Sequence, residues 1–206
     1  EIRIRDWSSD VCSSDLLTSF DVAQRAAALG FRVLATTRRP PEPTAANANS
    51  NAHSNSNASA HSSFNPVAGP VAAFVPFEEI LAASDFVSLH LPLTAATRHV
   101  INRQSLARIR RGAFLINTAR GGLVDHDALA EALADGRLAG AALDVQTPEP
   151  PDLARSPYND PRVIVTPHAA FFSAESLEEL RTQTARQVLA RIRGDVPANI
   201  VNQIMC

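Results

Sequence analysis

Short apolar runs alternate with amphipathic segments along most of this chain. The runs are hydrophobic at nearly every position instead of every second one, which is typical of strands buried on both faces. We expect such strands at residues 31–35, 72–75, 86–90, 113–117, 141–145 and 163–166, with helices at residues 21–29, 77–83, 103–110, 127–134 and 174–193. Strands that alternate with helices predict an α/β fold with a doubly wound parallel sheet, covered on both faces.

Residues 44–70 break this alternation, because they are rich in Ala, Asn, Ser and His and contain few apolar side chains. Such a segment buries too little apolar surface to offset the entropy lost on ordering. We interpret it as a disordered insertion within one domain that spans residues 17–206. His53 and His61 lie in it, and a metal-binding tract is the alternative. Since no Cys or carboxylate accompanies them, we expect no metal site.

Residues 1–16 also fall outside the pattern. Asp6–Leu16 shows neither helical nor strand periodicity, and it reads as the translation of a common sequencing-library adapter in one frame. We interpret residues 1–16 as adapter-derived and expect them to lie outside the fold. A genuine serine-rich leader is the alternative.

Charge and composition narrow the functional classes. The formal net charge is −2, with 19 basic and 21 acidic residues, which gives no basic footprint for nucleic acid. Two Cys residues make no disulfide framework, and no apolar run approaches the length of a transmembrane helix. We therefore expect a soluble, cytoplasmic protein that binds neither nucleic acid nor membrane.

Three chemically distinctive side chains follow apolar runs, in the order Arg120, Glu149 and His168. In parallel α/β sheets, ligands bind beyond the carboxyl ends of the strands, where these residues are expected. An arginine can clamp a carboxylate, and an imidazole backed by a carboxylate can move a proton. This combination suits a small 2-oxo or 2-hydroxy acid. The other histidines outside the insertion are expected to be structural (His90 and His99, the first beside the cleft) or exposed (His126).

Four motifs carry a resemblance to a known family: Leu91–Thr94, Asn117–Asp125, Leu143–Val145 and Pro167–Phe171. Their order and spacing resemble the D-isomer-specific 2-hydroxyacid dehydrogenases, from about Val22 to Asn202. The segment from Pro167 onward is most similar to the branch that includes the C-terminal-binding-protein corepressors. The resemblance implies a Rossmann-like dinucleotide-binding domain, truncated at its N-terminus, with most of the substrate domain missing.

The family's catalytic roles carry over to three matching positions. Arg120 would clamp the substrate carboxylate and polarise its 2-oxo group, a task that suits a planar guanidinium. His168 would be the general acid in reduction and the general base in oxidation. Glu149 would bind this imidazole, favour its protonated form and fix its orientation. The residues that the resemblance places along the cofactor cleft are Pro92, Thr94, Thr118, Ala119 and Asp144, the last contacting the nicotinamide amide.

The residues expected to bind the cofactor's phosphates and ribose depart from the family's pattern. A Gly-x-Gly-x-x-Gly loop should precede Val22, yet Ser14–Ser19 stands there and the first glycine is Gly30. Glycine lets the backbone approach the pyrophosphate closely, so we expect the pyrophosphate-binding loop to be lost at the adapter junction. After the second strand, Thr37 replaces the acidic residue that binds an NAD ribose, and Arg38 follows. We expect NAD or NADP as cofactor, with NADP favoured; acceptance of either is the alternative.

The resemblance thus implies an oxidoreductase that transfers a hydride between NAD(P)H and a small 2-oxo or 2-hydroxy acid, working as a homodimer. Since most of the substrate domain is missing, we expect exposed apolar surface and no measurable dehydrogenase activity from the chain itself. The alternative is an NAD(H)-sensing, corepressor-like binding protein. A third alternative is a plain dinucleotide-binding domain without substrate chemistry. The presence of three candidate catalytic residues argues against it: Arg120, Glu149 and His168.

Overall fold

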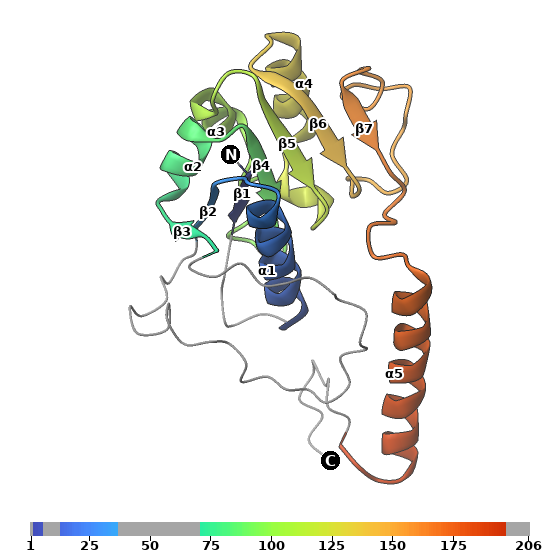
Figure 1. The fold of residues 1–206 in the computed structure, drawn as a ribbon. Coiled ribbons are helices and arrows are strands. Elements are labelled where there is room, and N and C mark those ends of the chain that lie inside the picture. The colour runs from blue at the N-terminus through green and yellow to red at the C-terminus, as the bar shows by residue number, and fades with distance from the viewer. Residues whose placement is uncertain (1, 6–12, 37–70, 197–206) are drawn as a thin grey trace. The chain divides into compact units, whose positions relative to one another are not determined.

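The computed structural model describes residues 2–5, 13–36 and 71–196, whose strands form one parallel sheet (Figure 1). The strands are β1 (Ile2–Arg5), β2 (Val33–Thr36), β3 (Ala73–Phe74), β4 (Phe86–Leu89), β5 (Ala113–Asn117), β6 (Leu138–Leu143) and β7 (Val163–Val165). The helices are α1 (Ser13–Ala28), α2 (Phe77–Ala83), α3 (Arg103–Arg108), α4 (His126–Ala134) and α5 (Ala174–Ile192), with the short 3-10 helix η2 (Gly121–Leu123). The chain divides into two compact units, Glu1–Pro167 and His168–Cys206, and the first contains the whole sheet.

The strand order explains which helices cover which face. The order is β3-β2-β1-β4-β5-β6-β7, and all neighbours are parallel. Crossovers between parallel strands are right-handed. The crossover from β1 to β2, through α1, runs toward the β3 edge of the sheet. The crossovers through α2, α3 and α4 run toward the β7 edge. These three helices therefore lie on the face opposite α1. The direction changes between β1 and β4, which is where such sheets bind ligands.

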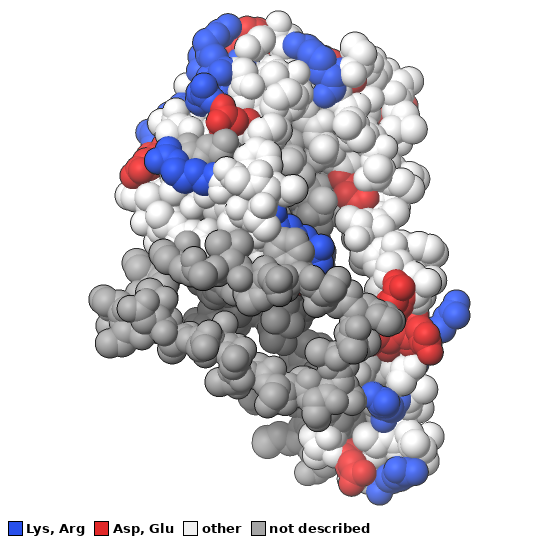
Figure 2. Space-filling view, viewed as in Figure 1, with Lys and Arg blue, Asp and Glu red and all other residues white. Residues whose placement is uncertain are grey.

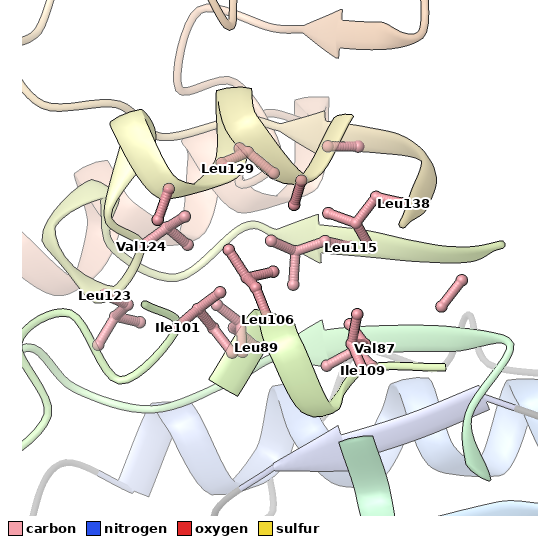
Figure 3. Packing of buried hydrophobic residues seen from close by; sticks show 14 of the residues in the cluster. Val87, Leu89, Ile101, Leu106, Ile109, Leu115, Leu123, Val124, Leu129 and Leu138 are labelled. Atoms are coloured by element: carbon pink, nitrogen blue, oxygen red, sulfur yellow. The ribbon is translucent and has the colours of Figure 1, made fainter. Parts of the chain in front are cut away.

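The main core lies between the sheet and the helices α2, α3 and α4 (Figure 3). Leu89, Leu115 and Leu129, from β4, β5 and α4, are fully buried within it. Burying a leucine side chain of this kind stabilises the fold by about 2 kcal/mol. A smaller cluster packs Ala23 and Ala26 of α1 against Val33 of β2.

Most expected elements are confirmed, and several boundaries move. The bounds of α2 and β5 agree with the expectation. β6 begins at Leu138 instead of residue 141, and α1 extends back to Ser13 instead of residue 21. α1 is followed by a turn at Gly30, whose φ of 85° is in the left-handed region that glycine adopts freely. The expected insertion at residues 44–70 lies outside the described residues.

The expectation that residues 1–16 lie outside the fold is wrong in part. Ile2–Arg5 forms β1 between β2 and β4, and Ser13 begins α1. The alternation of Ile and Arg in the first of these segments has the period of a strand, which explains why it can pair in a sheet. The adapter origin of the segment stays a prediction, and residues 6–12 lie outside the described part of the chain.

One face of the sheet is less covered than expected. Phe114 on β5 is 40% exposed and Ile164 on β7 is 67% exposed, although their strand neighbours Leu115 and Val163 belong to or pack on the main core. The crossovers on that side of the sheet run over the opposite face, so no described helix of the first unit covers these two side chains. Phe114 stacks on Phe86 instead, with ring centroids 5.3 Å apart.

The described surface mixes charges of both signs, and Figure 2 shows them interspersed on one face. Arg103 pairs with Glu131, and Arg162 pairs with Asp160 at 2.6 Å. Among the described residues, no helix is long and apolar enough to cross a membrane, and no group of three or more His, Cys, Asp or Glu side chains could hold a metal. His53 and His61 lie outside the part of the chain to which this statement applies.

Candidate active site

Arg120 stands in a short loop that directly follows β5 and is held by Asn117. The side chain of Asn117 is fully buried; its Oδ1 accepts the Ala119 N–H at 3.1 Å, and its Nδ2 donates to the Arg120 carbonyl at 2.9 Å. Arg120 is exposed, and its guanidinium donates to the Ala119 carbonyl at 2.6 Å. A buried amide thus fixes the loop backbone while the guanidinium stays accessible at the carboxyl edge of the sheet. In the sequence Asn117 stood out only as part of a motif, and this role was not predicted.

Two glycines after Arg120 allow this loop to approach its neighbours closely. A Cβ on Gly121 would lie 2.1 Å from the carbonyl oxygen of Gln146, and a Cβ on Gly122 would lie 2.9 Å from Cδ2 of Leu93. The loop after β5 therefore touches the loop after β6 through Gly121 and the loop after β4 through Gly122.

The two glycines should respond differently to substitution. Gly121→Ala should lower the free energy of unfolding by about 3 kcal/mol, because the methyl group meets backbone that must shift. Gly122→Ala should cost about 1 kcal/mol or less, because it meets the end of a flexible side chain and also restricts the unfolded chain. Urea unfolding of both variants of the 206-residue chain measures the difference. Equal losses would contradict the close approach at Gly121.

Pro92 and Thr94 form a turn after β4 that Thr97 closes. The Thr97 hydroxyl donates to the Pro92 carbonyl at 2.7 Å and accepts the Thr94 N–H at 2.7 Å. Thr118 is exposed and Ala119 is half-buried in the loop of Arg120. Leu93, in the loop after β4, packs on Gly122, in the loop after β5. These two neighbouring loops at one edge of the sheet carry four of the predicted cleft residues.

Asp144 directly follows β6 and is 4% exposed. Its backbone N–H donates to the Asn117 carbonyl at 3.0 Å, and its Oδ1 accepts the Thr166 hydroxyl at 2.5 Å. Asp144, which follows β6, is therefore linked to the end of β5 by its backbone and to the end of β7 by its carboxylate. Buried carboxylates are stable only with such hydrogen-bond donors around them.

Glu149 is exposed, and its carboxylate is oriented from within its own loop. Its Oε1 accepts the backbone N–H of Gln146 at 2.8 Å. Because the carbonyl of the same Gln146 packs on Gly121, Glu149 and the Arg120 loop share one backbone segment as their support. No role for Gln146 was predicted from the sequence.

His168 is the first residue of the second unit and is described with that unit. Its φ of 52° is in the left-handed region, which is uncommon for a residue other than glycine. Its ring lies 6.2 Å from that of Phe171 in an edge-to-face arrangement. Backbone strain of this kind costs about 1–3 kcal/mol and clusters at functional sites, which supports a role for His168. Thr37 and Arg38 lie outside the described residues.

Two further histidines differ in burial. His90 follows β4, is 7% exposed, and its Nε2 lies 2.8 Å from the Ser88 hydroxyl. Burial lowers the pKa of His90 from 6.5 to about 4, so its ring is neutral near pH 7. His126 is half-buried beside Tyr158, with ring centroids 5.6 Å apart, and burial lowers its pKa as well. The expectation that His126 is exposed is therefore wrong: the residue begins α4, and its ring packs against the loop before β7.

Stability should decrease in acid because of His90. The folded pKa of about 4 lies below the value of 6.5 expected for the unfolded chain, so the unfolded state binds the proton more tightly. The neutral His90 ring therefore adds a pH-dependent part to the free energy of unfolding, which amounts to about 3 kcal/mol. This part is fully present above pH 6.5 and is lost as pH falls toward 4. His90→Gln should therefore reduce the difference between unfolding free energies measured in urea at neutral pH and at about pH 4.5 by about 2–3 kcal/mol. Identical pH dependence in the two proteins would rule out this contribution.

Comparison with known proteins identifies the domain that carries this arrangement. The family described as D-isomer specific 2-hydroxyacid dehydrogenase, NAD binding domain, matches residues 51–170. The chain belongs to this family. Residues 71–170 of the matched segment include the loops of Pro92, Arg120, Asp144 and Glu149, as well as His168.

Relatives from several organisms agree with this membership. A glyoxylate reductase from Korarchaeum cryptofilum is 45% identical over 137 residues, which are 63% of this chain and 39% of that protein. The TT0316 protein from Thermus thermophilus is 33% identical with a TM-score of 0.74, over 98% of this chain and 53% of its own. The D-lactate dehydrogenase with NAD+ from Lactobacillus jensenii is 27% identical with a TM-score of 0.73, over 98% of this chain and 56% of its own. The chain therefore spans about half the length of these relatives or less.

Proposed function

We propose that this chain is the cofactor-binding part of an enzyme that transfers a hydride between NAD(P)H and a small 2-oxo or 2-hydroxy acid. The observation that carries the proposal is the joining of the Arg120 loop, Asp144 and Glu149 at the carboxyl edge of an NAD-binding-family sheet. When bound, the reduced dinucleotide would supply the hydride, and its oxidised form would accept it in the reverse direction.

The described residues fit the nicotinamide end of such a cofactor. Asp144 offers a buried carboxylate acceptor to the carboxamide, at the edge where Arg120 can hold the substrate carboxylate. The pyrophosphate end is different. Ser14–Ser19 lies in α1, and no glycine precedes Gly30 in the sequence, so the glycines that should cradle the phosphates are absent.

Three residues would perform the chemistry. Arg120 binds the carboxylate and polarises the 2-oxo group, so that negative charge developing on the substrate oxygen is stabilised. His168 gives that oxygen a proton in reduction and removes it in oxidation. By the family's pattern, Glu149 would orient the imidazole and stabilise its protonated form.

The proposal is tested in a chimera, defined as the Korarchaeum cryptofilum glyoxylate reductase with the counterpart of residues 71–170 replaced by these residues of this chain. All three proposed catalytic residues then come from this chain, while the reductase contributes the remainder of the protein. We expect the chimera to oxidise NADH or NADPH when glyoxylate is added. A folded chimera that binds the cofactor without turnover would contradict the proposal.

The 206-residue chain itself should show no measurable turnover of glyoxylate or hydroxypyruvate. The family's loop glycines are absent before Gly30, and the chain covers only part of its relatives. Robust turnover by the purified chain would show that activity requires neither the loop glycines nor the rest of the relatives' length.

We also propose NADP as the preferred cofactor and a homodimer as the assembly. The support for NADP is the sequence Thr37-Arg38-Arg39 after β2, which removes a carboxylate and supplies cations for a 2′-phosphate. A lower Kd for NADPH than for NADH in the 206-residue chain tests this. The reductase and dehydrogenase relatives do not favour the corepressor-like sensor that the sequence leaves as an alternative.

A further inference from the structure

Gln146 is a buried polar residue that no expected role accounts for. It lies in the loop after β6 and is 5% exposed. Its side-chain amide donates to the Leu143 carbonyl at 2.9 Å and to the Thr166 carbonyl at 3.1 Å. Leu143 ends β6 and Thr166 follows β7, so one NH₂ group links the ends of two neighbouring strands.

The backbone of Gln146 makes two further links. Its N–H donates to Oε1 of Glu149 at 2.8 Å. A Cβ on Gly121 would clash with its carbonyl oxygen, so the Arg120 loop packs directly on it. The loop after β5, the end of β7 and the Glu149 carboxylate therefore all meet a single residue.

We propose that Gln146 is a positioning residue that sets the relative placement of Arg120, Thr166 and Glu149; its role in catalysis rests on the function proposed above. The Thr166 hydroxyl also donates to the Asp144 carboxylate, which is assigned to the nicotinamide. By holding Thr166, Gln146 would therefore position Asp144 as well. An amide side chain suits the task because it can donate to two carbonyls at once without introducing a buried charge.

Two variants isolate the donors. Gln146→Met keeps the length of the side chain and removes both N–H groups, which leaves the Thr166 carbonyl without this donor. Gln146→Glu keeps the shape and places oxygen where the NH₂ group stands, against two carbonyl oxygens. Gln104→Met is the matched control, because Gln104 is exposed on α3.

Amide hydrogen exchange in the 206-residue chain gives a readout that needs no ligand. The Thr166 N–H donates to the Leu143 carbonyl at 3.0 Å, beside the Gln146 amide. The Phe114 N–H donates to the Asp85 carbonyl at 2.8 Å elsewhere in the sheet. In Gln146→Met and Gln146→Glu, exchange at Thr166 should accelerate at least about tenfold relative to Phe114, as expected for local opening. Acceleration of both amides by the same factor, or of neither, would overturn the proposal. Gln104→Met should leave the ratio unchanged.

Ligand binding then separates positioning of the site from general damage. NADH and ADP-ribose share the adenosine and pyrophosphate groups, and only NADH carries a nicotinamide. In the chimera, which takes everything outside residues 71–170 from the reductase, Gln146→Met should raise the Kd for NADH at least about fivefold, measured by nuclear magnetic resonance titration, with the Kd for ADP-ribose unchanged. Equal weakening for both ligands would overturn a role at the nicotinamide end. An unaltered chimera that binds neither ligand would contradict the proposed function, and the exchange ratio in the 206-residue chain would still decide the role of Gln146.

Discussion

Replacing Arg120 by alanine should reduce kcat/KM for glyoxylate in the chimera about a thousandfold or more. Arg120 is the proposed donor to both the substrate carboxylate and the 2-oxo oxygen, and it stands in a loop whose backbone Asn117 fixes. Removing it loses ground-state binding and also the stabilisation of charge that develops on the oxygen. Loss of one such donor costs about 10²–10³ in rate, and loss of a carboxylate clamp adds to it.

The form of the Arg120 defect is as informative as its size. Arg120→Lys should recover only part of the activity, because an ammonium keeps the charge but lacks the planar fork. Arg108→Ala is the control: Arg108 is an exposed arginine on α3 that pairs with Glu78 at 3.8 Å, and its loss should leave kcat/KM unchanged. An Arg120→Ala chimera within about threefold of the unaltered one, well short of the loss of a transition-state donor, would exclude Arg120 from substrate binding.

His168→Gln should lower kcat in the chimera by about 10²–10⁴ with little change in KM for the 2-oxo acid. The proposed role of His168 is proton transfer to the substrate oxygen, and general acid catalysis contributes this range. Glutamine keeps a polar side chain of similar size that cannot exchange the proton. The left-handed backbone of His168 supports the idea that its placement is demanding.

The control for His168 is another histidine with a similar backbone. His99 also has a positive φ, of 51°, and is exposed. His99→Asn should preserve kcat, since asparagine tolerates this conformation. Glu149→Gln should lower kcat less than His168→Gln, because it weakens only the orientation and charge of the imidazole. If His168→Gln retained full kcat, the general acid would have to be another group.

Hydrophobic pattern was enough to predict the elements whose side chains meet a continuous core. β5 was predicted with the bounds it has, because Ala113–Asn117 is an apolar run between turn residues. The start of β6 was missed because Gly140 weakens the strand pattern. The structure explains that glycine, since a Cβ there would lie 2.7 Å from the Arg162 carbonyl in the neighbouring strand connection.

The site residues show a different limit. Arg120 and Glu149 were proposed from motif order, whereas Gln146 was not, because a glutamine in a loop next to prolines reads as a solvated side chain. Its importance comes from carbonyls at the ends of β6 and β7, and only the sheet brings these together. His126 was misjudged for the same reason, since its contact with Tyr158 depends on a loop distant in sequence.

The transfer of label from reduced cofactor to product tests the central claim most directly. NADH or NADPH carrying deuterium at the transferable C4 position is incubated with glyoxylate and the chimera, and the 2-hydroxy acid is analysed by mass spectrometry. The account predicts one deuterium at C2 of the product, lost in the Arg120→Ala and His168→Gln variants together with turnover. Consumption of the cofactor without label at C2 would contradict hydride transfer at this site.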